Sequence, residues 1–102
     1  MVGAEAVEGV NQFYFDLALV GAAGVDPLVG FTEYNPDEVA VTRAILRRSA
    51  RRVVLADSSK LGRIATVVAS ELQHIDLLVT DDDADPDVVA GLRAQDLHVE
   101  LV

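Results

Sequence analysis

Short apolar runs alternate with amphipathic segments along the chain, and this alternation predicts an α/β fold. Three continuous apolar runs have the length of buried strands: 17–20, 53–56 and 77–80. The run 53–56 predicts a strand that is buried on both faces. Residues 97–102 alternate apolar and polar side chains, which is typical of a half-buried strand. Apolar residues at helical spacing predict three helices: 3–14, 36–49 and 86–95. Strands that alternate with helices favour a mostly parallel sheet with flanking helices.

The second and third predicted helices carry clear start signals. Asn35 is a good N-cap, Pro36 then takes the first helical position, and Glu38 occupies the capping-box place three residues after the cap. The third predicted helix has the same signals, with Asp85 as its N-cap and Pro86 at its first helical position.

The segments between these elements have weaker patterns. We expect four features there: a hydrogen-bonding loop at 30–35, a turn at 59–63, an edge strand at 64–69 and a helical turn at 71–75.

Polar residues follow the apolar strands and indicate a functional edge. In an open parallel sheet, ligands bind outside the carboxyl ends of the strands. That edge would hold Gly21–Asp26, Asp57–Lys60 and Thr80–Asp81. Lys60 is the only lysine of the chain and lies one turn from Asp57. An ordinary surface ion pair between the two would also explain this spacing.

Composition narrows the classes of partner. The 102 residues suffice for one core, and 17 acidic against 8 basic residues give a net charge of −9. Such a surface repels nucleic acid and anionic membranes. The absence of cysteine excludes disulfides and thiolate chemistry, and no apolar run approaches the ~20 residues of a membrane span. We therefore expect a cytoplasmic protein.

Five of the eight basic residues cluster at the end of the second predicted helix and just after it: Arg43, Arg47, Arg48, Arg51 and Arg52. Cations there complement the negative end of the helix dipole. A phosphate-binding or partner-binding patch is the alternative interpretation.

Metal and cofactor motifs are absent from the sequence. Asp81, Asp83 and Asp85 match positions one, three and five of an EF-hand loop, but Pro86 replaces the glycine required at position six and Leu92 the glutamate at position twelve. The chain has neither a dinucleotide-binding nor a P-loop glycine pattern. We expect no metal and no cofactor.

Four segments in register carry a family resemblance: Asp16–Asp26 (DLALVGAAGVD), Gly30–Asn35 (GFTEYN), Leu55–Gly62 (LADSSKLG) and Ile75–Asp81 (IDLLVTD). Together they resemble the C-terminal effector-binding domain of DeoR-family transcriptional regulators. The resemblance implies a sensor for a phosphorylated sugar, a fold like that of ribose-phosphate isomerases, and no catalysis. DNA would be bound only by a separate N-terminal helix-turn-helix domain, and self-association is expected.

The resemblance also implies a ligand site. Asp26 and Glu38 would bind ligand hydroxyls, Lys60 would bind an anionic or hydroxyl group, and Asp57 would orient Lys60. Thr32, Asn35 and Ser58 would make secondary contacts.

Two alternatives remain open: a sugar-phosphate isomerase-like enzyme, or an oligomerisation module without ligand. Ala23 stands where the isomerases carry aspartate, and their second lysine has no counterpart, which argues against catalysis. We further expect residues 1–102 to be one partial domain, the later half of a sensor. The phosphate-cradling loop and the DNA-binding domain would precede it.

Overall fold

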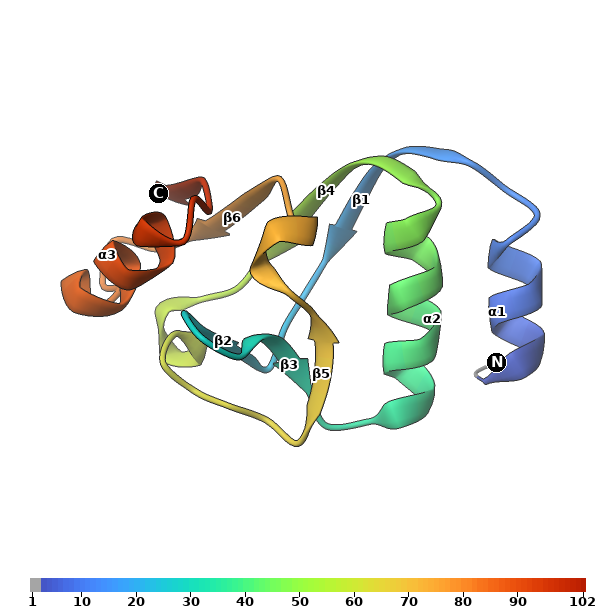
Figure 1. The fold of residues 1–102 in the computed structure, drawn as a ribbon, viewed down its shortest axis with the longest axis horizontal. Helices are drawn as coiled ribbons and strands as arrows, with labels where there is room; N and C mark the ends of the chain where they lie inside the picture. The colour runs from blue at the N-terminus through green and yellow to red at the C-terminus, as the bar shows by residue number, and fades with distance from the viewer. Residues whose placement is uncertain (1–2) are drawn as a thin grey trace.

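The computed structural model describes residues 3–102 and has two sheets (Figure 1). The strands are β1 (Phe15–Val20), β2 (Gly24–Asp26), β3 (Gly30–Glu33), β4 (Ser49–Leu55), β5 (Val67–Ser70), β6 (Leu77–Thr80) and β7 (Val99–Leu101). The helices are α1 (Ala4–Val10), α2 (Pro36–Arg47) and α3 (Pro86–Ala94), with 3-10 turns η1 (Ser58–Lys60) and η2 (Leu72–His74).

The first sheet is parallel, with strand order β1-β4-β6-β7. Its strands include the apolar runs of the sequence, so the predicted α/β class with a mostly parallel sheet is confirmed. All four strands end at the same edge, and at that edge the backbone N–H of Val102 donates to the Thr80 carbonyl oxygen at 2.9 Å.

The second sheet is antiparallel, with order β2-β3-β5, and was not predicted. The expected loop at 30–35 is wrong, because Gly30–Glu33 pairs on both sides as β3. The expected edge strand at 64–69 is found slightly later, as β5. Strands of three or four residues are too short to show a period in the sequence.

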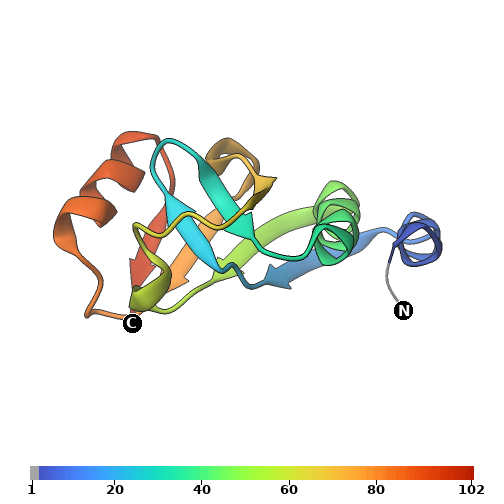
Figure 2. The same cartoon turned by 90° about the horizontal axis from the view of Figure 1, so that it is seen from below.

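The core lies on one face of the parallel sheet. Ala18, Val54, Leu78 and Val99 are buried there, and Figure 2 shows α2, α3 and the antiparallel sheet on that same side. The alternate residues point to the other face, which no described element covers.

Exposed leucines mark this bare face. Leu17, Leu19 and Leu55 are 49%, 59% and 47% exposed. The prediction that 53–56 is buried on both faces is therefore wrong for Leu55, although Val53 is buried by its neighbours.

The first helix is shorter than predicted, whereas the other two agree closely. α1 ends at Val10, since Gly9 and Asn11 are poor helix formers, and Phe13 and Tyr14 lie beyond it with 60% and 69% exposure. The Asn35 cap is confirmed by its side chain, which accepts from the N–H groups of residues 37 and 38. Within residues 3–102 there is no helix with the length and apolarity needed to cross a bilayer.

Candidate functional site

The ends of β4 and β6 are joined by a carboxylate. Ser58 comes just after β4, and Asp81 comes directly after β6. The backbone N–H of Ser58 donates to Asp81 Oδ2 at 2.8 Å. The Ser58 N–H, and after it the Ser58 hydroxyl, holds the pKa of Asp81 below its ordinary 3.8. The structure thus brings together two of the three predicted strand-end segments through a direct hydrogen bond.

Asp57 organises the turn that follows β4. Its Oδ1 accepts from the Ser59 N–H at 2.9 Å and also from the Ser59 hydroxyl, capping η1. The Ser59 hydroxyl is the main cause of a lowered pKa at Asp57, and the positive charge of Lys60 lowers it further. Lys60 is half-buried, and it forms no ion pair with Asp57 within residues 3–102, although its charge contributes to the lowered pKa of that carboxylate.

The third strand-end segment is anchored through its backbone. Val25 forms a bridge with Leu61, and the Gly62 N–H donates to the Val25 carbonyl oxygen at 2.8 Å. The next residue, Asp26, accepts from the N–H groups of Leu28 and Val29 at 2.9 and 2.8 Å. Asp26 Oδ2 therefore stabilises its own turn, while Asp26 Oδ1 accepts no hydrogen bond from residues 3–102.

Thr32 differs from its predicted role, because its side chain is fully buried. Its hydroxyl donates to the Gly24 carbonyl oxygen at 3.3 Å and accepts from the Ala65 N–H at 2.9 Å. This hydroxyl ties the antiparallel sheet to the 61–66 loop, which leaves it no face for a ligand.

Asn35 and Glu38 lie exposed at the start of α2. The Asn35 side-chain oxygen caps the helix by accepting from the N–H groups of Asp37 at 2.9 Å and Glu38 at 3.3 Å. In the described part of the chain, no hydrogen bond or ion pair links either residue to Asp57, Ser58 or Lys60. The structure thus does not join these two residues to the strand-end residues.

Asp81 was placed at this edge by the sequence but was not chosen as a site residue. One carboxylate oxygen from each of Asp81, Asp82 and Asp83 lies within 4.8 Å of the other two, a spacing that could hold a cation. The two Asp81 oxygens already accept backbone N–H groups of Ser58 and Asp83, so turn formation accounts for this arrangement.

Two cavities lie away from these residues. One, of about 410 Å³, is formed by α2, β4, β5 and η2, and the other, of about 270 Å³, lies beside the 27–30 turn. Neither is lined by Asp57, Ser58 or Lys60, which lie on an open surface at the strand ends.

The family model "DeoR C terminal sensor domain" matches residues 1–82. The chain belongs to the DeoR sensor-domain family. This confirms the resemblance drawn from the four sequence segments.

The relatives of this DeoR sensor domain are transcriptional regulators and not enzymes. The chain is 30% identical over 101 residues to the Glycerol-3-phosphate regulon repressor of Escherichia coli, covering 99% of this chain and 39% of that protein. It is 36% identical over 87 residues to the HTH-type transcriptional regulator GlpR of Haloferax volcanii, with 85% and 34% covered. The HTH-type transcriptional repressor GlcR of Bacillus subtilis is 32% identical over 81 residues, with 79% and 31% covered. The chain spans about a third of the length of these curated relatives.

Proposed function

We propose that this DeoR sensor domain binds a phosphorylated sugar or a related metabolite at the carboxyl ends of β1, β4 and β6. The observation that carries the proposal is the junction of these ends, where the Ser58 N–H donates to Asp81 and Lys60 stands beside Asp57. Lys60 supplies a cation at an edge otherwise rich in carboxylates. The name of one relative, a glycerol-3-phosphate regulon repressor, refers to a phosphorylated metabolite and supports this ligand class.

In this proposal Lys60 binds an anionic or hydroxyl group of the ligand, and Asp57 orients Lys60. The free oxygen of Asp26 and the carboxylate of Glu38 bind ligand hydroxyls, with Asn35 and Ser58 at the margin. Carboxylates suit hydroxyl donors, because an ionised carboxylate only accepts hydrogen bonds. Ligand binding would control operator binding by a separate helix-turn-helix domain, and the protein would act in the cytoplasm. The relatives whose names include "HTH-type" are in keeping with this.

Calorimetric titration of the 102-residue chain with aldose and ketose phosphates tests the site. We expect a saturable signal for one phosphorylated sugar and none for its unphosphorylated form. Lys60→Ala should weaken binding about ten-fold or more, because a charge-assisted hydrogen bond contributes roughly 1.5–3 kcal/mol.

Arg63→Ala is the matched control, because it removes an exposed cation only three residues from Lys60. Within residues 3–102, the Arg63 side chain makes no hydrogen bond or ion pair with the strand ends. If Lys60→Ala and Arg63→Ala bind the sugar phosphate equally well, the assigned site is wrong. If no sugar phosphate binds, the strand ends of these 102 residues do not form a sugar-phosphate site.

We propose in addition that the domain self-associates through the bare face of the parallel sheet. Parallel sheets occur almost only with both faces covered, and here Leu17, Leu19 and Leu55 are about half exposed on the uncovered face. A second copy of the chain would bury them.

A further inference from the structure

Three arginines line the cavity of about 410 Å³: Arg43, Arg47 and Arg52. They come from the last two turns of α2 and from β4. The cavity touches β4 at Arg52, in the middle of the strand, whereas Asp57 follows its end. Asp57 is five positions after Arg52, which at about 3.3 Å a position is about 16 Å, so the cavity is distinct from the strand-end site.

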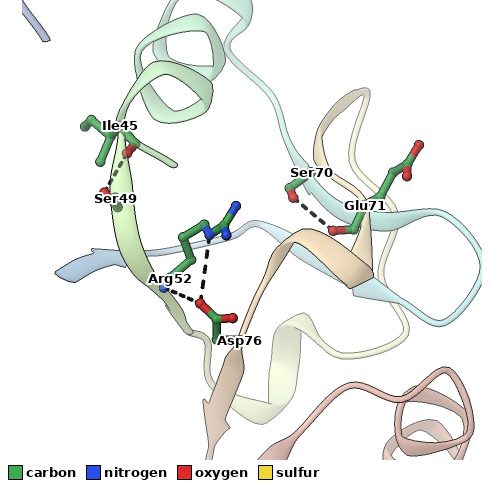
Figure 3. Close-up of polar contacts among 6 residues, drawn as sticks. All are labelled: Ile45, Ser49, Arg52, Ser70, Glu71 and Asp76. Carbon is green, nitrogen blue, oxygen red and sulfur yellow. Dashed lines mark hydrogen bonds and ion pairs between the residues drawn. The ribbon is translucent and has the colours of Figure 1, made fainter. Parts of the chain in front are cut away.

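Arg52 reaches the cavity from the helix-covered face of the sheet. Its Nε is buried without a hydrogen-bond partner in the described residues and lies 3.8 Å from Asp76 Oδ2 (Figure 3). Asp76 is bound instead by the Arg52 backbone N–H at 2.7 Å. The guanidinium thus forms a long ion pair with Asp76 and makes no side-chain hydrogen bond to any residue from 3 to 102.

The two arginines on α2 differ in how firmly their side chains are held. Arg43 donates to the Val68 carbonyl oxygen, which fixes its guanidinium against β5. Arg47 is exposed and makes no ion pair with any residue from 3 to 102. A positive residue in the last turn complements the helix dipole, and this explains Arg47 alone. It does not explain Arg52, which lies on a strand.

Charge and surface chemistry define what the cavity can hold. Glu71 is the one carboxylate in its wall, and Figure 3 shows that its carboxylate points away from Arg52. Leu46, Val68 and Ala69 supply an apolar wall beside the guanidinium groups. Guanidinium forks match phosphate oxygens in geometry, and this local positive cluster stands out in a chain whose net charge is −9.

We propose that this arginine cavity is a second ligand site, which binds a small phosphate ester whose carbon body packs on the apolar wall. The proposal does not depend on the strand-end site. It assigns the arginine cluster of the sequence to anion binding and not only to the end of α2.

Heteronuclear NMR of the 102-residue chain tests the proposal, with phenyl phosphate, inorganic phosphate and benzoate as probes at constant ionic strength. We expect saturable shifts of the amides of Leu46, Arg52 and Ser70. Phenyl phosphate should bind more tightly than inorganic phosphate, which lacks an apolar body, and more tightly than benzoate, which carries a single charge. Arg47→Gln should weaken phenyl phosphate binding about ten-fold.

Arg51→Gln is the matched control, because it removes the same charge from β4 on the opposite, bare face. Arg52→Lys, which keeps the charge but loses the fork, should also weaken binding. Equal affinity in Arg47→Gln and Arg51→Gln, equal affinity for benzoate, or shifts confined to Ser58 and Asp81 would each overturn the proposal. The last result would assign phosphate to the strand-end site alone.

Discussion

The carboxylates at the strand ends hold the backbone of their own loops. Asp26, Asp57 and Asp81 each accept two or more hydrogen bonds, most of them from backbone N–H groups within three residues. Such bonds fix the loops before any ligand arrives. In the proposed ligand site, affinity would then depend chiefly on the ammonium of Lys60.

Replacing the Ser59 hydroxyl should raise the pKa of Asp57. This hydroxyl is the largest cause of the lowered pKa, so Ser59→Ala should move it towards 3.8, as followed by carboxyl carbon NMR. Asp81 is the internal control, because its hydrogen bonds come from Ser58 and Asp83 and not from Ser59. A carboxyl group whose pKa is lower in the folded state than in the unfolded state stabilises the fold at pH values above the unfolded-state pKa. That stabilisation is lost as the pH falls through the folded-state pKa. Ser59→Ala should therefore bring acid unfolding to a higher pH. An unchanged Asp57 pKa would contradict this account.

At the scale of elements, the antiparallel sheet meets the 61–66 loop through a close backbone approach at Gly24. A Cβ on Gly24 would lie 2.6 Å from Thr32 Oγ1 and closer still to the carbonyl oxygen of Arg63. Glycine therefore lets β2 lie against the 61–66 loop, and that contact brings the Asp26 turn next to η1.

Gly24→Ala should destabilise the domain by about 1–3 kcal/mol, because the clash is with backbone that cannot move alone. Urea unfolding measures the change. Gly9→Ala is the control, since an added Cβ there meets open space among the described residues and alanine favours the helix by about 1 kcal/mol. Equal stability of the Gly24→Ala variant and the parent would contradict the close approach.

Elements with local signals could be predicted from the sequence, and those that depend on distant pairing could not. The cap and proline at residues 35 and 36 define the start of α2, and the run 77–80 is β6 itself. β3 became a strand only because β2 and β5 lie on either side of it, and β5 begins more than 30 residues later.

The candidate site divides in the same way. The strand ends could be placed, because parallel strands end together. The use of the Thr32 hydroxyl could not be foreseen, since its partner Ala65 belongs to a loop 33 residues away. The arginine cluster was visible in the sequence, but the cavity required η2 and β5 to pack beside α2.

At the scale of the whole molecule, helices cover one side of the parallel sheet only (Figure 2). The open side combines exposed leucines with an edge strand, β1, that has no strand beside it on its outer side among the described residues. Both features favour association, which the net charge of −9 opposes through repulsion.

Sedimentation velocity should show a dimer that strengthens with added salt, because salt screens the repulsion. Leu19→Lys on the bare face should weaken it about ten-fold or more, since a buried leucine contributes roughly 1.5–3 kcal/mol. Leu28→Lys is the control, because Leu28 is 88% exposed on a turn outside both sheets. A parent chain that stays monomeric, or equal effects of the two variants, would contradict self-association through this face.

The bond between Val102 and Thr80 places the end of the chain beside Asp81, at the proposed effector edge. The chain has no cysteine of its own. Val102→Cys would therefore create a unique thiol for a fluorescent dye within reach of that edge. An environment-sensitive dye there would convert the domain into a single-label optical biosensor, while an affinity tag is better attached near α1, at the other end of the long axis (Figure 1).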